Sequence, residues 1–471
     1  MKMIIGGKFV DKEKKINVLN PEDESVIDTV PSADNNDVET AFNIAKEGAV
    51  EMEKLSAYDR YSILLKAAEI INSRLEEFAK TIAMEGIKTI KEARLEVKRA
   101  INTVTYAAEE AKRIYGEVIP MDGDFRSLNR FGYWVREPVG VVLAITPYND
   151  PLNMVAHKSS PAIAAGNALV LKPTYLTPLS AIKMGEVFLE AGLPEKAISI
   201  ITGKSSEIGD SLVSNPIPRV VAFTGGVEAG ETITKNAGLK KIFMELGSSS
   251  AVIVLDDADL ERAIPSIVSG SFWAAGQNCI GVQRVYIHKD VYDKFVDGFV
   301  EMTKNYKVGK KLNESTDMGP MITKEEANRV ESWVKEAVDM GAKVLCGAKR
   351  EGNFYWPTAL ENPPRDAKVV SKEVFGPVVS FFKIDTLDEG INGANDSEYG
   401  LHAAIFTQDV DRALKAAKRL KFGGVLINDS TDFRVDYMPF GGYKHSGIGR
   451  EGLRFAIEEM SEVKMVIFTK K

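Results

Sequence analysis

Cys279 is the residue of this sequence best suited to covalent chemistry. It follows the segment Ser271-Phe-Trp-Ala-Ala-Gly-Gln-Asn and lies just past Gly276, at the end of an apolar, helix-like run. A sulfur at such a turn can be exposed while neighbouring backbone N–H groups face an anion that forms beside it. The alternative is a structural thiol, because free cysteine commonly packs as a small hydrophobe.

A carboxylate upstream would complement this thiol. Glu245 ends the short strand-like run Phe243-Met-Glu245-Leu-Gly247. A thiolate can attack a carbonyl, and a carboxylate can then activate the water that releases the acyl group. Cys279 and Glu245 together therefore indicate covalent catalysis through an acyl intermediate.

Gly225 and Gly226 are candidates for binding phosphate. They follow the strand predicted over 219–223 and open a helix, where a glycine turn lets a pyrophosphate approach backbone N–H groups. The spacing is not G-x-G-x-x-G, and no Lys-Ser/Thr pair follows, so a P-loop is excluded. The alternative is a strand-to-helix turn that simply needs glycine.

Lys172 and Asn149 each lie just beyond a predicted strand. Open α/β sheets bind ligands at the carboxyl edge of their strands, so the lysine could reach a ribose or phosphate and the asparagine could face a ligand. A solvated lysine and an Asx turn before Pro151 are the alternatives.

The elements that must position these residues form two α/β series. Near-continuous apolar strands alternate with helices from Val139 onward, first over 139–223 and again over 251–427, which is typical of parallel βαβ units covered on both faces. The first hundred residues predict a strand pair and amphipathic helices, including one over 58–83. Two isolated strands, over 134–136 and 463–468, need a partner and predict a separate small sheet or arm.

Composition narrows the class of protein. The chain has 471 residues, is 44% hydrophobic and 27% charged, and carries a net charge of -7. These values are typical of a globular protein with two or three domains, and they argue against nucleic acid as a partner. Two cysteines point to a reducing compartment, so we expect a cytoplasmic protein, and no stretch is apolar enough for a membrane span. None of the four histidines has another at helical spacing, so no metal site is expected.

Seven motifs occur in one order along the chain. They are Pro147-Tyr-Asn149, Leu171-Lys172-Pro173, Phe223-Thr-Gly225-Gly, Met244-Glu245-Leu-Gly247, Gly276-Gln-Asn-Cys279, Glu373-Val-Phe375-Gly-Pro377 and Pro439-Phe440-Gly-Gly442-Tyr-Lys444-His-Ser446-Gly447. Together they resemble the aldehyde dehydrogenase superfamily over essentially the whole chain.

The resemblance implies an α/β fold with three parts. A variant Rossmann domain that binds the dinucleotide would take 1–119 and 137–247, an α/β catalytic domain 248–452, and a small β oligomerisation arm 120–136 and 453–471. It also implies a homodimer or homotetramer that oxidises a small aldehyde to a carboxylic acid with NAD or NADP.

The same resemblance implies roles for individual residues. Cys279 would be the nucleophile, Asn149 with the Cys279 backbone N–H would form the oxyanion hole, and Glu245 would be the base for deacylation. The cofactor would be held by Lys172 and Glu373 at the ribose hydroxyls, Phe375 near the nicotinamide, and the turn Gly225-Gly226 at the pyrophosphate. We also expect the pKa of the Cys279 thiol to be lowered locally, since free cysteine is only a few per cent thiolate near neutrality.

One departure from the commoner pattern bears on the cofactor. Many members of the family that prefer NAD have Glu three residues after the strand-end lysine, where this chain has Tyr175. Without that carboxylate, and with Lys204 near the adenine end, a 2′-phosphate is tolerable, so NADP is favoured over NAD. The alternative is that Lys204 is only a solvated loop charge.

The substrate is predicted from the residues beside the nucleophile. The chain resembles the branch that contains lactaldehyde, glyceraldehyde and non-phosphorylating glyceraldehyde-3-phosphate dehydrogenases. Members that bind phosphorylated aldehydes often have Arg where this chain has Asn278, and Asp150 would repel an anion. A small neutral hydroxyaldehyde such as lactaldehyde or glyceraldehyde is therefore the first expectation. Arg434, which Asp432 and Asp436 could neutralise, keeps glyceraldehyde 3-phosphate as the second.

Two further classes stay open. A CoA-acylating dehydrogenase passes the acyl group to CoA and usually lacks the deacylating glutamate, so Glu245 argues against it. An inactive structural homologue would be expected to have lost Cys279, Glu245 or Asn149, and all three are present.

Overall fold

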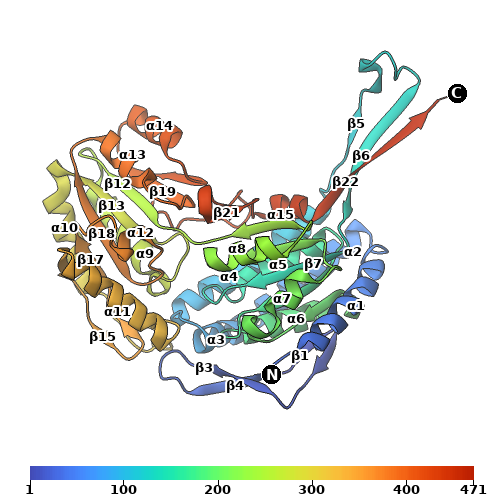
Figure 1. The fold of residues 1–471 in the computed structure, drawn as a ribbon, viewed down its shortest axis with the longest axis horizontal. Helices are drawn as coiled ribbons and strands as arrows, with labels where there is room; N and C mark the ends of the chain where they lie inside the picture. The colour runs from blue at the N-terminus through green and yellow to red at the C-terminus, as the bar shows by residue number, and fades with distance from the viewer. Residues whose placement is uncertain (471) are drawn as a thin grey trace.

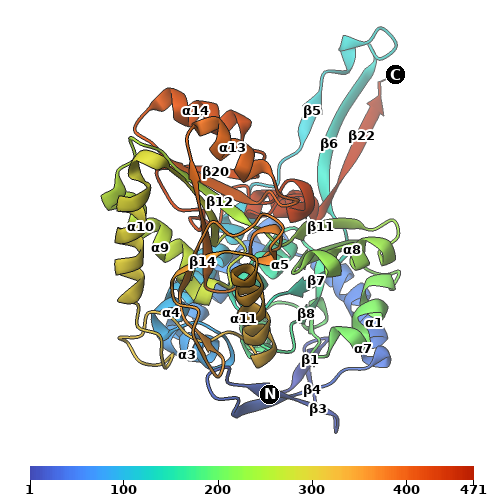
Figure 2. The same ribbon diagram turned by 60° about the vertical axis from the view of Figure 1, so that its left-hand side comes forward.

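The computed structural model describes residues 1–470 and consists of two α/β units and a projecting three-stranded sheet (Figure 1). Each unit is built on its own sheet, and the N-terminal unit also contains a short separate hairpin. The arm stands away from the body in both views, with the C-terminal end of the chain near its tip (Figure 2). The predicted fold class, α/β with a small separate β sheet, is confirmed.

The first sheet has eight strands with a parallel centre. Its order is β2-β1-β9-β8-β7-β10-β11-β21, and the five strands from β9 to β11 are parallel to one another, whereas β1 and β21 pair antiparallel at the two sides. The bounds are β1 Met3–Ile5, β2 Lys8–Val10, β7 Val141–Thr146, β8 Ala168–Pro173, β9 Ile198–Ile200, β10 Val220–Thr224, β11 Lys241–Glu245 and β21 Gly447–Ile448. The central strands are apolar and buried because helices cover both faces.

Eight helices precede or connect these strands. Their bounds are α1 Asn35–Met52, α2 Ala57–Ser73, α3 Leu75–Glu85, α4 Ile90–Ala111, α5 Asn153–Ala164, α6 Leu179–Ala191, α7 Ser205–Ser214 and α8 Val227–Asn236, with a 3₁₀ turn, η2, over Glu195–Ala197. The prediction of a single helix over 58–83 is wrong. The helix is interrupted at Arg74, whose φ and ψ of -113° and 23° are not helical, and α2 and α3 lie on either side of it. The hydroxyl of Ser73 donates to the carbonyl of Ile70 there, which satisfies the end of α2.

The second sheet has seven strands in the order β14-β17-β18-β13-β12-β19-β20, and all neighbours are parallel except β14 and β17. The strands are β12 Ser250–Val254, β13 Val282–His288, β14 Lys343–Cys346, β17 Thr358–Glu361, β18 Val378–Ile384, β19 His402–Phe406 and β20 Gly424–Ile427, and a hairpin of β15 Arg350–Glu351 and β16 Phe354–Tyr355 lies beside them. The helices of this unit are α9 Leu260–Phe272, α10 Lys289–Lys304, α11 Lys324–Asp339, α12 Lys368–Ser371, α13 Leu387–Asn395 and α14 Val410–Arg419. The 3₁₀ turns η3 Trp273–Gly276 and η4 Lys444–Ser446 complete it.

The two isolated strands predicted from sequence pair with each other. β22, Ser461–Thr469, runs antiparallel to β6, Arg130–Pro138, over nine residue pairs, and β5, Glu117–Ile119, adds the third strand. The turn η1, Met121–Gly123, lies between β5 and β6. The last helix, α15 Leu453–Glu459, packs on the core of the first unit through Leu453 and Ile457.

One further hairpin belongs to the N-terminal unit. The hairpin of β3, Lys15–Leu19, and β4, Val26–Pro31, lies apart from the larger sheets. Among the helices that the structure describes, none combines the length and apolar character needed to cross a membrane.

Candidate active site

A cleft of about 1530 Å³ is lined by residues of both α/β units. It is larger than the roughly 300–1,000 Å³ of most small-molecule sites, which leaves room for a dinucleotide and a second ligand. The C-terminal ends of the parallel strands β7, β8, β10 and β11 contribute to it, as expected for the ligand edge of an open α/β sheet. Cys279, Glu245 and Asn149, which lie far apart in the sequence, all line this cleft.

A strained turn carries the nucleophile candidate. Helix α9 ends at Phe272, and Ala274, Ala275 and Gly276 then adopt φ values of 52°, 54° and 66°. This backbone is left-handed, which glycine adopts freely and alanine does not. At Gly276 a Cβ atom would lie 2.2 Å from the carbonyl oxygen of Gly376, so only glycine fits the close approach of the two loops. Cys279 follows and is partly exposed to the cleft.

The thiol of Cys279 is poorly ionised in this environment. Burial raises its pKa, the carboxylate of Glu373 raises it further, and the guanidinium of Arg434 opposes the shift. The expected local lowering of the thiol pKa is therefore wrong, because desolvation disfavours the thiolate more than the nearby cation favours it.

Glu245 is a buried carboxylate at the end of β11, only 3% exposed. Within residues 1–470 neither of its carboxylate oxygens has a hydrogen-bond partner. Burial raises its pKa well above the usual value, the nearby Glu451 adds to this, and Lys158 opposes it. A carboxyl group held without partners beside the cysteine is available to exchange a proton with a ligand or a water.

Asn149 follows β7, is 7% exposed and lines the cleft. The next residue, Asp150, forms an ion pair with Lys88 and lies 3.8 Å from Arg99. These cations keep the pKa of Asp150 below its usual range even though burial alone would raise it. The repulsion that Asp150 was expected to exert on an anionic substrate is thus largely offset, since its charge is neutralised within the fold.

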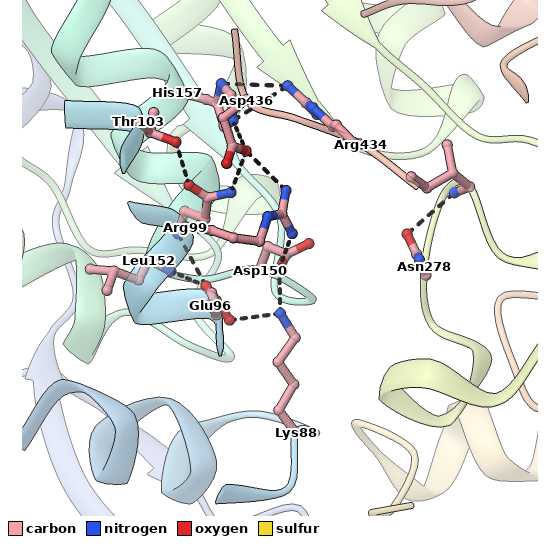
Figure 3. Close-up of polar contacts among 12 residues, drawn as sticks. Lys88, Glu96, Arg99, Thr103, Asp150, Leu152, His157, Asn278, Arg434 and Asp436 are labelled. Carbon is pink, nitrogen blue, oxygen red and sulfur yellow. Dashed lines mark hydrogen bonds and ion pairs between the residues drawn. The ribbon is translucent and has the colours of Figure 1, made fainter. Parts of the chain in front are cut away.

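Figure 3 shows the chain of ion pairs behind Asp150. Lys88 also binds Glu96, with 2.7 Å between Nζ and Oε2, and Arg99 binds Asp436 at 3.1 Å between Nη2 and Oδ1. Lys88 and Glu96 are fully buried, so the ion pair between them is shielded from water. Sequence analysis did not identify Lys88, Glu96 or Arg99 as part of the site.

A second set of buried ion pairs surrounds Arg434. Its Nη2 lies 2.9 Å from Oε2 of Glu451, whose Oε1 accepts from Nζ of Lys158 at 2.7 Å. The guanidinium also lies 3.8 Å from the ring centre of Phe440. Asp436, one of the two residues expected to neutralise Arg434, instead binds Arg99 and His157. The counter-ion of Arg434 in this structure is Glu451.

Sequence analysis did not identify Lys158 as a buried charge. Every residue of α5 is buried, so a lysine in that helix must find a buried partner. The partner, Glu451, is 293 positions further along the chain, and nothing in the sequence connects the two.

Several polar groups in the cleft lack a partner, as expected where a cofactor binds. The hydroxyls of Thr146 and Thr224, at the ends of β7 and β10, are buried and make no hydrogen bond within the described chain. Lys172 is 2% exposed, donates within residues 1–470 only to the carbonyl of Pro173, and has its pKa lowered to about 8 by burial. Glu373 accepts from the backbone N–H of Ser248 at 2.8 Å, and burial raises its pKa to about 7. These donors and acceptors fit a ligand with ribose hydroxyls and phosphate oxygens.

Four other predicted cofactor residues, Gly225, Gly226, Tyr175 and Phe375, lie along the same cleft, whereas Lys204 is not among the residues that line it. The Gly225-Gly226 turn joins β10 to α8, and a Cβ atom at Gly226 would meet open space. Tyr175 lines the cleft, and the ammonium of Lys204 lies 5.9 Å from its ring centre. Phe375 has a left-handed φ of 44° and packs edge-on against Tyr148 at 5.7 Å between ring centres. Asn278, next to Cys279, lines the cleft as well.

Comparison with known proteins identifies the class. Residues 9–466 match the aldehyde dehydrogenase family, and the chain belongs to it. It is 46% identical to a 3-sulfolactaldehyde dehydrogenase of Priestia aryabhattai, covering 99% of this chain and 97% of that protein, and 42% identical to a lactaldehyde dehydrogenase of Methanococcus aeolicus, covering all of both. It is also similar to the crystal structure of a glyceraldehyde-3-phosphate dehydrogenase of Methanocaldococcus jannaschii complexed with NADP, with a TM-score of 0.94, 42% identity, and coverage of 98% of this chain and 100% of that one.

The protein is therefore an enzyme that oxidises an aldehyde with NAD or NADP. The match also confirms the expected oxidoreductase class.

Proposed function

We propose that this enzyme oxidises a small 2-hydroxyaldehyde, such as lactaldehyde or glyceraldehyde, to the carboxylate through a covalent intermediate on Cys279. The observation that carries this proposal is the charge balance around the thiol. Four buried or half-buried cations (Lys88, Arg99, Lys158, Arg434) pair with four carboxylates (Glu96, Asp150, Asp436, Glu451). A pocket in which these eight charges pair with one another favours a neutral, polar ligand.

The first half of the proposed reaction takes place on the thiol. The Cys279 thiol releases its proton to solvent water, and the thiolate sulfur then forms a bond to the aldehyde carbon, so the carbonyl oxygen becomes an oxyanion. The side-chain amide of Asn149 and the backbone N–H of Cys279 donate to that oxygen, and one such donor contributes roughly 3 to 4 kcal/mol to the transition state. The cofactor, when bound, would supply the acceptor for the hydride that this carbon loses. Loss of the hydride leaves a thioester on the Cys279 sulfur.

The second half releases the acid. Glu245 takes a proton from a water, whose oxygen attacks the thioester carbon, and the carbon–sulfur bond breaks. The Cys279 sulfur leaves as the thiolate, the acid departs as the carboxylate, and Glu245 releases its proton to solvent. Because burial raises the pKa of Glu245, this step slows as the pH falls and the base becomes protonated.

The cofactor and the assembly are further parts of the proposal. We infer a preference for NADP, because Tyr175 stands where a carboxylate would repel a 2′-phosphate and Lys204 lies beside it. The structural neighbour complexed with NADP supports this preference. The arm of β5, β6 and β22 exposes apolar side chains, among them Val463, Met465, Ile467 and Phe468, and would join copies of the chain into a homodimer or homotetramer.

A second candidate is an aldehyde with a terminal anion, such as glyceraldehyde 3-phosphate. The observation that favours it is that Nε of Arg99 and Nε of Arg434 are buried and lack hydrogen-bond partners in the described residues. Both arginines line the cleft with Cys279. The relative that acts on sulfolactaldehyde and the structural neighbour named for glyceraldehyde 3-phosphate are consistent with an anionic group at this end.

A panel of aldehydes separates the two candidates. Lactaldehyde, glyceraldehyde, 3-sulfolactaldehyde and glyceraldehyde 3-phosphate are assayed with NAD and NADP by following reduced nicotinamide. We expect the neutral hydroxyaldehydes to have the higher kcat/KM and expect Asn278→Arg to shift the ratio at least ten-fold toward the phosphate, through a bidentate donor. A preference of the unmodified enzyme for an anionic aldehyde that Arg434→Ala removes would instead establish the second candidate.

The same assay tests the CoA-acylating alternative. With CoA added, the proposed enzyme still forms the free acid, because Glu245 supplies the base for hydrolysis. Formation of acyl-CoA in place of the acid would refute the hydrolytic step.

A further inference from the structure

The left-handed turn before the nucleophile is held by a carboxylate from the other α/β unit. Oε1 of Glu92, on the first turn of α4, accepts a hydrogen bond from the backbone N–H of Ala274 at 2.9 Å. Glu92 and Ala274 are 182 positions apart and both are buried. Through this hydrogen bond Glu92 contacts a residue that belongs neither to α4 nor to its N-terminal cap.

Glu92 is itself held in place by its helix. Its Oε2 accepts from the backbone N–H of Thr89 at 2.8 Å and from the Thr89 hydroxyl at 3.0 Å, which completes a capping box at the start of α4. Burial raises the pKa of Glu92, while the N–H groups of Ala274 and Thr89 and the charge of Lys88 favour the ionised form. One oxygen thus anchors the carboxylate and the other is presented to the turn.

The turn needs such support because its backbone is unfavourable. Ala274 and Ala275 have no glycine-like freedom at φ values of 52° and 54°. Gln277 contributes from the other side, since its Nε2 donates to the carbonyls of Ala274 and Pro320 and its Oε1 accepts from the N–H of Ile322. Cys279 is two residues beyond Gln277, so the direction in which the chain leaves the turn sets the position of the sulfur.

We propose that Glu92 is a positioning residue for the nucleophile: it holds the left-handed turn at Ala274 and so places the Cys279 sulfur opposite the oxyanion donors. The inference rests on the proposed role of Cys279. Glu92 acts through the backbone and touches neither substrate nor sulfur. In this arrangement α4 of the first unit determines the geometry of the nucleophile carried by the second.

The test separates misplacement of the sulfur from loss of folded enzyme. It uses the Glu245→Gln background, in which the reaction is expected to pause after one turnover, so the burst amplitude counts competent sites and the burst rate reports the steps up to reduction of the cofactor. Glu92→Ala should lower the burst rate at least ten-fold and leave the amplitude close to that of the parent. Destabilisation alone would lower the amplitude and leave the rate unchanged.

Two further variants sharpen the result. Ala274→Gly added to Glu92→Ala should recover at least half of the lost rate on a logarithmic scale, because glycine adopts the left-handed turn without support. Asp59→Ala is the matched control, since Asp59 closes an equivalent capping box with Ser56 at the start of α2, away from this turn. It should change the rate less than two-fold.

Three outcomes overturn the inference: a burst rate within two-fold of the parent in Glu92→Ala, the same loss of rate in Asp59→Ala, or a rate that Ala274→Gly does not recover. If Glu92→Ala does not accumulate as folded protein, Glu92→Gln replaces it, with an expected loss of two- to five-fold, and an unchanged rate there also overturns the inference. Cys279→Ala is measured alongside. A burst in Cys279→Ala would overturn the proposed nucleophile itself. If Cys279→Ala shows no burst but the burst rate of Glu92→Ala equals that of the parent, only the positioning role is overturned.

Discussion

Replacing Glu245 by glutamine should separate reduction of the cofactor from release of the acid. The substitution keeps the shape of a side chain that is 3% exposed and removes the only proton acceptor on it. We expect Glu245→Gln to produce a burst of about one reduced cofactor per active site and then to turn over slowly, because reduction precedes the step that needs the base. Cys279→Ala should show neither phase.

The size of the effect follows from the lack of a substitute base. General base catalysis contributes typically 10²- to 10⁴-fold. Three other carboxylates of the cleft are engaged: Glu451 by Lys158 and Arg434, Asp150 by Lys88, and Glu373 by the backbone N–H of Ser248. We therefore expect steady-state kcat to fall by roughly 10³, or about 4 kcal/mol in the deacylation barrier. The raised pKa of Glu245 adds a pH signature, since kcat of the unmodified enzyme should fall as the pH decreases and the residual turnover of the variant should lack that dependence.

The assay is rapid mixing with excess aldehyde and cofactor, followed by absorbance of the reduced nicotinamide. Glu398→Gln is the matched control, because Glu398 lies in the same cleft but is paired with Lys372 at 3.0 Å on its exposed rim. It should leave both phases nearly unchanged. An equal loss of the burst in Glu245→Gln and Cys279→Ala would refute the reasoning, since Glu245 would then act before or during reduction.

Changing Tyr175→Glu should weaken NADP much more than NAD, by placing a carboxylate where the 2′-phosphate would lie, and an unchanged ratio of kcat/KM for the two cofactors would mean that the adenine end has been misplaced. Binding of the cofactor, measured by fluorescence titration, should strengthen as the pH rises through about 7, where Glu373 ionises to accept from ribose hydroxyls, and weaken above about 8, where Lys172 loses its proton. Glu373→Gln should abolish the acid limb and Lys172→Met the alkaline limb, and a profile that keeps both limbs in either variant argues against these roles. Ile467→Lys on β22 should lower the mass measured by sedimentation, because it charges the apolar face of the arm, and an unchanged mass would show that the arm does not join the subunits.

The sequence by itself determined the class of fold, and it predicted the roles of Cys279 and Glu245 that the proposed mechanism uses. Apolar strands that alternate with helices specify parallel βαβ units, because strands buried on both faces lack the alternation of polar and apolar residues seen in half-exposed strands. The two isolated strands, predicted over 134–136 and 463–468, were correctly expected to lie outside the main sheets. They pair with each other, since a lone strand cannot satisfy its backbone hydrogen-bonding groups. Glycine turns and strand ends also point to a cofactor edge, because the carboxyl ends of parallel strands converge there.

Only the tertiary structure decided the electrostatics and the strain of the site. Asp150 was expected to repel anions, but its charge is cancelled by Lys88, 62 positions away, and Lys158 finds Glu451 across 293 positions. Such ion pairs leave no local pattern in the sequence, because any number of residues can separate the two partners. The pKa of Cys279 is raised by the same folding that removes water from the cleft. Ala274 and Ala275 show no preference for a left-handed backbone, and they adopt it because contacts from distant segments, Glu92 among them, outweigh the local cost.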